Sequence, residues 1–293
     1  MRRSWLTIGL ALVTASTSLV TAGCSDSGSD PTAITSHSPS GDAASPSELD
    51  IAWEAFEGVA DRPPVRLEDV RLPEPPPGFS TADVQALADR LIELVERSTS
   101  PGLTEMSADD ALQYVFATLP SPTLQNLREM MAGLQSEQKF AWQWSLASRY
   151  PPGATVGNVS YLDPQLSTKA VSSPSGKYLV VTLATLIRTD VTTRGSDEAH
   201  PVLIQRNISM SAYRPQAIDA DYWPAVGFSF KTYGADLCAG FRDNLVEPTT
   251  DLKTLRVMTS RLRQDLKVRN VSDGANMGEQ TLTKIEKVLA GCG

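Results

Sequence analysis

Apolar residues recur at helical spacing in the part of the chain that follows residue 78. Three stripes of this kind predict helices that begin near Ser80, at Ser107 and at Ser121, because each starts with a serine suited to capping a helix. A fourth helix is predicted at about 136–149. The apolar members of the three stripes are Val84, Leu87, Leu91, Leu94, Leu112, Val115, Phe116, Leu119, Leu124, Leu127 and Leu134.

From residue 156 the pattern changes to the alternation that is typical of strands. The predicted strands cover 156–162, 166–171, 178–191, 203–213 and 226–231. Strands this long and this close in sequence predict a curled antiparallel meander. Two further helices are predicted at 251–268 and 278–290. The sequence therefore predicts an α+β fold for a single domain at 79–293, with N-terminal helices, a curled antiparallel β-sheet and C-terminal helices.

The chain before residue 79 has a different composition. Residues 25–46 are mostly Ser, Asp, Gly, Pro, Thr and Ala, which cannot bury enough apolar surface to offset chain entropy. Residues 47–60 could form a short helix with Trp53, Phe56 and Ala60 on one side, which packs on its own domain or, less simply, docks on a partner. The prolines of 63–77 indicate a stiff extended spacer. We therefore expect a tether at 24–78.

The chain of 293 residues is acidic, with 26 Lys and Arg against 34 Asp and Glu and a net charge of −8. Nucleic-acid-binding proteins instead carry a basic stripe, so nucleic acid is excluded as the expected partner. A hydrophobic fraction of 41% is sufficient for one well-buried core.

The N-terminus has the layout of an export signal. Arg2 and Arg3 precede an uncharged stretch that ends in Thr21-Ala22-Gly23-Cys24. This ending resembles the lipobox of bacterial lipoprotein precursors. The resemblance implies that residues 1–23 are a signal peptide and that Cys24 is lipidated. It also implies anchoring through membrane lipid at the outer, extracytoplasmic face of the bacterial plasma membrane. An ordinary secretory signal with an incidental cysteine is the alternative.

If Cys24 carries lipid, Cys238 and Cys292 are left as a pair in an oxidising compartment. We expect a disulfide between them, which would close a loop of about 55 residues and contribute roughly 4 kcal/mol in the loop-entropy treatment. Two buried free thiols are the alternative.

Helices followed by a curled antiparallel sheet also resemble the NTF2-like or cystatin-like α+β domains of some bacterial envelope proteins. The resemblance extends over about 150 residues of the predicted fold and contains no diagnostic motif, so it implies a fold and not a function.

Few residues suit catalysis. His200 is predicted to lie in a polar loop between two strands. Asp219 and Asp221 adjoin Tyr222 and Trp223, an aromatic and acidic combination that lines some sugar and cation sites, although an aromatic plug in a loop is the simpler interpretation. No catalytic residue, cofactor or metal site is therefore expected.

The sequence offers more candidate residues for binding than for catalysis. Aromatic and methionine side chains could line an apolar pocket beneath the curled sheet, although most such residues are simply core. The candidates are Met130, Met131, Trp142, Trp144, Tyr222 and Trp223. Residues 251–270 form a basic helix that could face anionic groups or simply be solvated. Its charged residues are Lys253, Arg256, Arg261, Arg263, Lys267 and Arg269 against Asp251 and Asp265.

These observations favour a lipid-anchored, extracytoplasmic, non-enzymatic protein of the bacterial cell envelope that binds an apolar ligand or another envelope protein. The first alternative is an accessory subunit of an envelope transport or assembly complex that docks through Trp53 and Phe56 or through the sheet edge. The second is an envelope enzyme that uses Asp219 and Asp221 or His200.

The lipobox interpretation predicts that a fatty-acid analogue fed to cells labels the wild-type protein and does not label Cys24→Ala, because the cysteine sulfur is the site of attachment. The measurement is in-gel detection of the analogue in the two purified proteins. Equal labelling of both would contradict the anchor.

Overall fold

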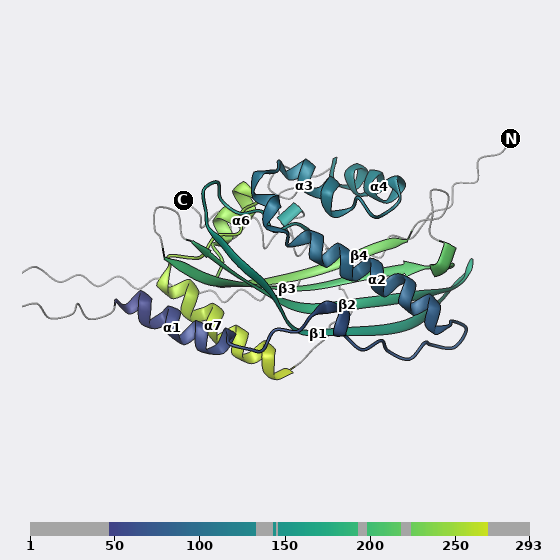
Figure 1. Cartoon of the computed structure of the whole chain (residues 1–293), viewed down its shortest axis with the longest axis horizontal. Helices are drawn as coiled ribbons and strands as arrows, with labels where there is room; N and C mark the ends of the chain where they lie inside the picture. The colour runs from purple at the N-terminus through teal and green to yellow at the C-terminus, as the bar shows by residue number, and fades with distance from the viewer. Residues whose placement is uncertain (1–46, 133–142, 145, 193–197, 218–223, 269–293) are drawn as a thin grey trace, which may run out of the picture.

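The computed structural model describes residues 47–132, 143–144, 146–192, 198–217 and 224–268. Among the described residues, helices α1 to α4 precede a four-stranded sheet, and α6 and α7 follow it (Figure 1). This arrangement is an α+β fold, as the sequence predicts. The helices are α1 (Glu48–Ala60), α2 (Thr81–Ser98), α3 (Ala108–Val115), α4 (Ser121–Ala132), α6 (Leu237–Asp243) and α7 (Leu252–Val268), and short 3-10 turns lie at Leu67–Asp69, Pro101–Glu105 and Pro215–Ala217.

Local capping explains where the first helices begin. Ser47 and Asp50 form a capping box at the start of α1, and Ser80 and Asp83 form another at the start of α2. In each, the serine hydroxyl accepts from the backbone of the third helical residue, and the aspartate accepts from the serine N–H. Ser107 caps α3 in the same way through its hydroxyl. The predicted helix starts at Ser80 and Ser107 are confirmed.

The four strands form an antiparallel meander in the order β1-β2-β3-β4. Their bounds are β1 Val156–Ser173, β2 Gly176–Thr192, β3 Ala199–Ala212 and β4 Ala225–Tyr233. The two stretches predicted at 156–162 and 166–171 are one strand, interrupted by a bulge between Leu162 and Gln165. Within the bulge, Asp163 has a φ of 47°, and Pro164 has no N–H to give to the ladder. The break in the sequence pattern therefore marks a bend and not a strand end.

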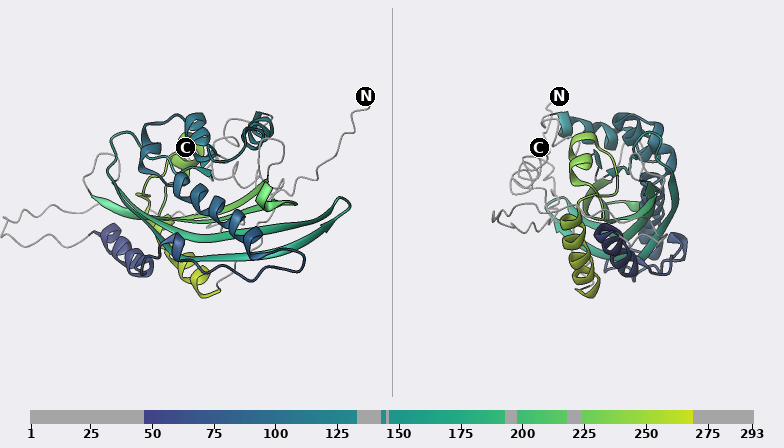
Figure 2. Two further views of the ribbon diagram at one scale, coloured as in Figure 1. Left: turned by 45° about the vertical axis from the view of Figure 1, so that its right-hand side comes forward. Right: turned by 90° about the vertical axis from the view of Figure 1, so that its left-hand side faces the viewer.

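Helices cover both faces of the long, curved sheet (Figure 2). On one face, α2, α3 and α4 bury the largest apolar cluster against β2, β3 and β4, including Leu91, Leu183 and Ile208. On the other face, α1 and α7 lie side by side and bury a second cluster that includes Phe56, Leu203 and Leu262. Two apolar faces on the central strands require two helical layers.

Residues 47–78, which the sequence assigns to the tether, pack against the domain predicted at 79–293. In α1 the predicted stripe of Trp53, Phe56 and Ala60 is fully buried against the rest of the domain. The helix at 47–60 therefore packs on its own domain, and Trp53 and Phe56 are not available as a docking surface.

The proline-rich stretch that was expected to be a spacer also packs on the domain. Val65 N–H donates to the backbone oxygen of Tyr161 at 2.8 Å, and the Thr168 hydroxyl donates to the backbone oxygen of Glu74 at 3.0 Å. Leu67 enters the main core. This stretch therefore lies along the outer edge of β1 and covers part of an otherwise exposed strand edge.

A third apolar cluster lies where one end of the sheet meets α6. The Trp144 ring contacts Phe230 and Phe241 edge-to-face, at centroid distances of 5.5 and 5.4 Å. Gly240 of α6 lies directly against this ring, and a Cβ at that position would be 2.5 Å from the ring. A side chain at residue 240 is therefore incompatible with this packing.

The sequence did not predict α6, which carries Cys238. Asp236 caps this helix through hydrogen bonds from the Cys238 and Ala239 backbone at 2.7 and 3.2 Å. Cys238 is disulfide-bonded, and it is the only cysteine among the described residues. Cys24 and Cys292 lie outside those residues, so the pairing with Cys292 stays a prediction.

Two glycine-to-alanine changes test this packing in opposite directions. Gly240→Ala should lower the free energy of unfolding by about 1–3 kcal/mol, because the new methyl group overpacks the buried Trp144 ring. Gly58→Ala, within α1, should raise it by about 0.5–1 kcal/mol, because its Cβ meets no atom within 4 Å and the unfolded chain loses entropy. Urea denaturation measures both, and a neutral Gly240→Ala would contradict the placement of Trp144.

Candidate functional site

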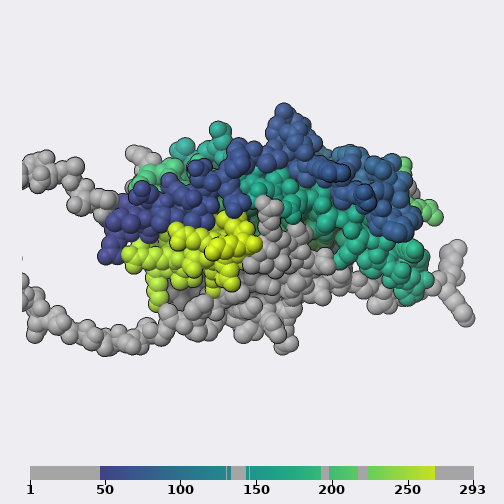
Figure 3. Space-filling view, turned by 90° about the horizontal axis from the view of Figure 1, so that it is seen from below, coloured from purple at the N-terminus to yellow at the C-terminus, as the bar shows by residue number. Residues whose placement is uncertain are grey.

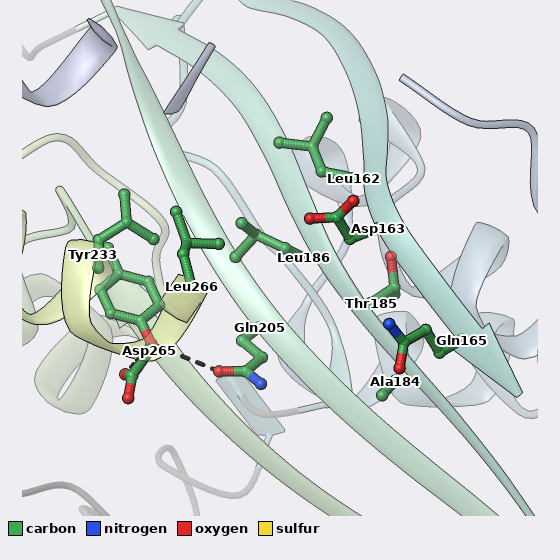
Figure 4. Close-up of a pocket in the computed structure, with 11 residues that line it drawn as sticks. Leu162, Asp163, Gln165, Ala184, Thr185, Leu186, Gln205, Tyr233, Asp265 and Leu266 are labelled. Atoms are coloured by element: carbon green, nitrogen blue, oxygen red, sulfur yellow. Dashed lines mark hydrogen bonds between the residues drawn. The ribbon is translucent and has the colours of Figure 1, made fainter. Parts of the chain in front are cut away.

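A pocket of about 80 Å³ opens between the sheet and α7 (Figure 4). Its residues come from five elements, with three from β1, three from β2, one each from β3 and β4, and three from α7. They are Leu162, Asp163, Gln165, Ala184, Thr185, Leu186, Gln205, Tyr233, Leu262, Asp265 and Leu266. The lining combines leucines with carboxylate, amide and hydroxyl groups, and none of its described residues is Lys, Arg or His.

The local sequence explains both walls of the pocket. Leu262 and Leu266 are four residues apart, so they lie on one face of α7 and point toward the sheet. The other wall of the pocket comes from β1, which the bulge bends at Asp163. Bulges commonly re-aim side chains at the rim of a site. The pocket therefore lies where the strand bends and the helical layer does not fill the space.

A hydrogen-bonded group joins α7 to β4 at one side of the pocket. The Tyr233 hydroxyl donates to Oδ2 of Asp265 at 2.5 Å and lies 3.4 Å from Oε1 of Gln205. Lys231 Nζ donates to the same Asp265 oxygen at 3.2 Å. Burial, followed by the hydrogen bond to Asp265, raises the pKa of Tyr233 well above its ordinary value. Tyr233 is therefore a neutral donor at physiological pH.

Asp163 forms the opposite rim. The backbone of Asp163 is in the left-handed region, which Asp tolerates better than most other residues do. Oδ2 of Asp163 pairs with Nη1 of Arg62, which follows α1. The bulge, the pocket rim and the end of α1 are therefore tied together by one ion pair.

The predicted pocket residues are not gathered around one cavity. Met131 lies in the core under α2 to α4, whereas Trp144 lies in the cluster at the end of the sheet, and both are buried. Their side chains fill the interior and do not line the pocket. The Met130 side chain and Trp142, Tyr222 and Trp223 lie outside the described residues, as do Asp219 and Asp221.

His200 is not in a loop, which corrects the prediction. It is the second residue of β3 and is buried. Its ring stacks on Trp53 of α1, with centroids 4.3 Å apart and an interplanar angle of 6°. Carboxylate oxygens of Glu57 and Glu198 each lie 3.8 Å from one ring nitrogen. His200 therefore helps to join α1 to β3 and does not line the pocket.

The described part of the basic helix corresponds to α7. Lys253, Arg256, Arg263 and Lys267 are exposed on its outer side, and Arg256 pairs with Glu48 of α1 at 3.0 Å. The acidic residue of the helix, Asp265, faces the sheet and the pocket (Figure 4). Asp265 is therefore a residue of this helix that belongs to the site and that the basic pattern of the sequence does not single out.

Two signals in the sequence pointed weakly to the pocket. One is the break at Leu162-Asp163-Pro164-Gln165 between two apparent strands, and the other is an aspartate on the apolar side of a basic helix. Neither signal predicts that Gln205 and Tyr233 join them, because that juxtaposition depends on strand register.

Comparison of the chain with protein-family models, with curated proteins and with solved structures gives no significant match. The relation to lipoprotein precursors and the NTF2-like or cystatin-like resemblance therefore stay predictions. In the described ranges, no helix has both the length and the apolarity needed to span a bilayer. Within the same ranges, no three His, Cys, Asp or Glu side chains are grouped as metal ligands would be.

The Tyr233 environment predicts a specific loss of stability at high pH. The unfolded chain ionises this tyrosine near pH 10, while the folded chain keeps it protonated because its pKa is raised. Its contribution is therefore fully present below pH 10 and declines above it, by up to about 1.4 kcal/mol per pH unit. Tyr233→Phe should show a correspondingly shallower decline in the free energy of unfolding between pH 10 and 11.

The measurement is urea denaturation at several alkaline pH values. Tyr213→Phe is the matched control, since Tyr213 is an exposed residue near the end of β3, and it should follow the wild type. A slope for Tyr233→Phe equal to that of the wild type would contradict the buried, hydrogen-bonded placement of Tyr233.

Proposed function

We propose that this chain is a lipid-anchored, extracytoplasmic, non-enzymatic protein of the bacterial cell envelope, and that it binds another envelope protein through the pocket between β1, β2 and α7. This proposal selects the protein partner from the two kinds of ligand that the sequence allows. It includes an accessory role in an envelope transport or assembly complex.

The small volume of the pocket is the reason for choosing a protein partner over a small apolar ligand. A volume of about 80 Å³ is far below the range of roughly 300–1,000 Å³ for sites that enclose a small molecule. Meanwhile, the apolar clusters on both faces of the sheet are filled by the protein's own side chains. A pocket of this size suits one side chain of a partner, as the anchor points of protein interfaces do.

The polar residues of the pocket support binding over catalysis. The only pair in the described lining that could serve as acid and base is Tyr233 and Asp265. The Asp265 carboxylate, however, already accepts hydrogen bonds from Tyr233 and from Lys231. Such mutually satisfied groups orient a ligand more readily than they exchange protons with it.

The position of the pocket supports a partner close to the membrane. The pocket and α1 lie on the same side of the sheet, and α1 and α7 are adjacent on the face seen in Figure 3. With lipid on Cys24, only the residues from Cys24 to Pro46 would separate α1 from the point of attachment to the bilayer.

The proposal predicts a position-specific crosslink in cells. A photoreactive amino acid at Gln165, in the pocket lining, should give a discrete adduct with an envelope protein, and one at Ser175, in the β1–β2 turn, should not. The readout is a shifted band identified by mass spectrometry.

Filling the pocket supplies the matched control for this crosslink. Ala184→Leu adds volume to the lining and should abolish the Gln165 adduct while the protein stays folded and membrane-associated. An adduct that persists unchanged in Ala184→Leu, or that forms equally from Ser175, would contradict docking at the pocket.

A further inference from the structure

We infer that the pocket receives a lysine or arginine side chain of the partner protein, with the alkyl stem against the leucines and the cationic head at the carboxylate rim. This inference rests on the proposed docking function and adds to it the chemistry that the pocket recognises.

The described lining residues carry two carboxylates, those of Asp163 and Asp265, and none of them is a base. Arg62 and Lys231 approach these carboxylates from outside the lining. An anionic ligand would therefore meet two carboxylates, whereas a cationic head meets charges of opposite sign.

Each carboxylate retains a free oxygen among the described contacts. Oδ2 of Asp163 binds Arg62, and Oδ2 of Asp265 binds both Lys231 and Tyr233, while Oδ1 of neither residue takes part in these bonds. A carboxylate can accept hydrogen bonds at both oxygens. The two side chains remain 45% and 34% exposed, so a ligand can reach them.

The rest of the lining matches an alkyl stem and a donor-rich head. Leu186 and Leu266 lie between the two carboxylates in Figure 4, Leu162 lies beside Asp163, and Gln165 and Gln205 add amide groups to the lining. Lysine and arginine side chains commonly bury their methylene groups on apolar surface while the charged end contacts polar groups. A purely apolar side chain would leave the amides and carboxylates without new partners.

The test uses photoreactive probes on the detergent-solubilised full chain. One probe is an alkyl diazirine that ends in guanidinium, and the matched probes have the same alkyl diazirine ending in hydroxyl or in carboxylate. Peptide mapping by mass spectrometry then locates the labelled residues. The guanidinium probe should label lining residues about fivefold more than the hydroxyl probe, as expected for an ion pair at a partly exposed carboxylate, and the carboxylate probe should label them least.

Charge-neutralising variants make the test specific. Asp163→Asn preserves the shape and suits the left-handed backbone of the bulge, and it should reduce guanidinium labelling toward the level of the hydroxyl probe. Asp265→Asn should do the same from the opposite rim. Asp61→Asn removes the same charge from an exposed residue outside the lining and should leave labelling unchanged.

Equal labelling by the guanidinium and hydroxyl probes, or an equal response of Asp163→Asn and Asp61→Asn, would overturn the cation inference. If either result is obtained but the Gln165 crosslink still forms in cells, docking at the pocket still stands and only the inferred chemistry of recognition is wrong. If both the crosslink and the probe labelling are absent from the pocket, the proposed function fails as well.

Discussion

Burial of both faces of the two central strands is the constraint on which the rest of this structure depends. Successive side chains of a strand point to opposite faces, so Leu183 of β2 enters the core beneath α2 while Leu186 enters the core beneath α1 and α7. Both faces need a helical cover, and one helix from each end of the domain supplies the second cover. The pocket lies where α7 passes the β1 bulge, in a space that none of the described core residues fills.

On the opposite face of the sheet, a buried arginine fixes how the helical layer sits on the strands. Arg206 of β3 is fully buried, and among the described residues no carboxylate pairs with it. Its guanidinium donates to Ser98 at the C-terminus of α2 and to the Ser148 hydroxyl at 2.9 Å. The carbonyl end of a helix attracts a cation. Burial lowers the pKa of Arg206 to about 10, so the side chain stays charged at neutral pH. A buried charge with only dipolar partners fixes the position of α2 over the sheet at an energetic cost.

The two layers therefore have different roles. In the layer of α2, α3 and α4, the apolar side chains form the largest of the three clusters, and Arg206 donates hydrogen bonds to Ser98 and Ser148. The layer of α1 and α7 is held by fewer and more polar contacts, among them the stack of Trp53 on His200 and the Tyr233–Asp265 hydrogen bond. Polar groups that stay partly exposed can be shared with a partner, whereas buried apolar side chains cannot. This difference is why the functional argument rests on the α7 side of the sheet.

The sequence by itself determined the fold class, the capped starts of α2 and α3, the antiparallel meander and the apolar stripe of α1, because helix caps and residue spacing act over a few neighbouring positions. Only the tertiary structure decided that 47–78 is part of the domain, that Trp144 and Met131 are interior, and that His200 stacks on α1. It alone brought Asp163, Gln205, Tyr233 and Asp265 to one pocket. Those contacts join residues far apart in the chain, and strand register and layer packing set them, which no local pattern encodes.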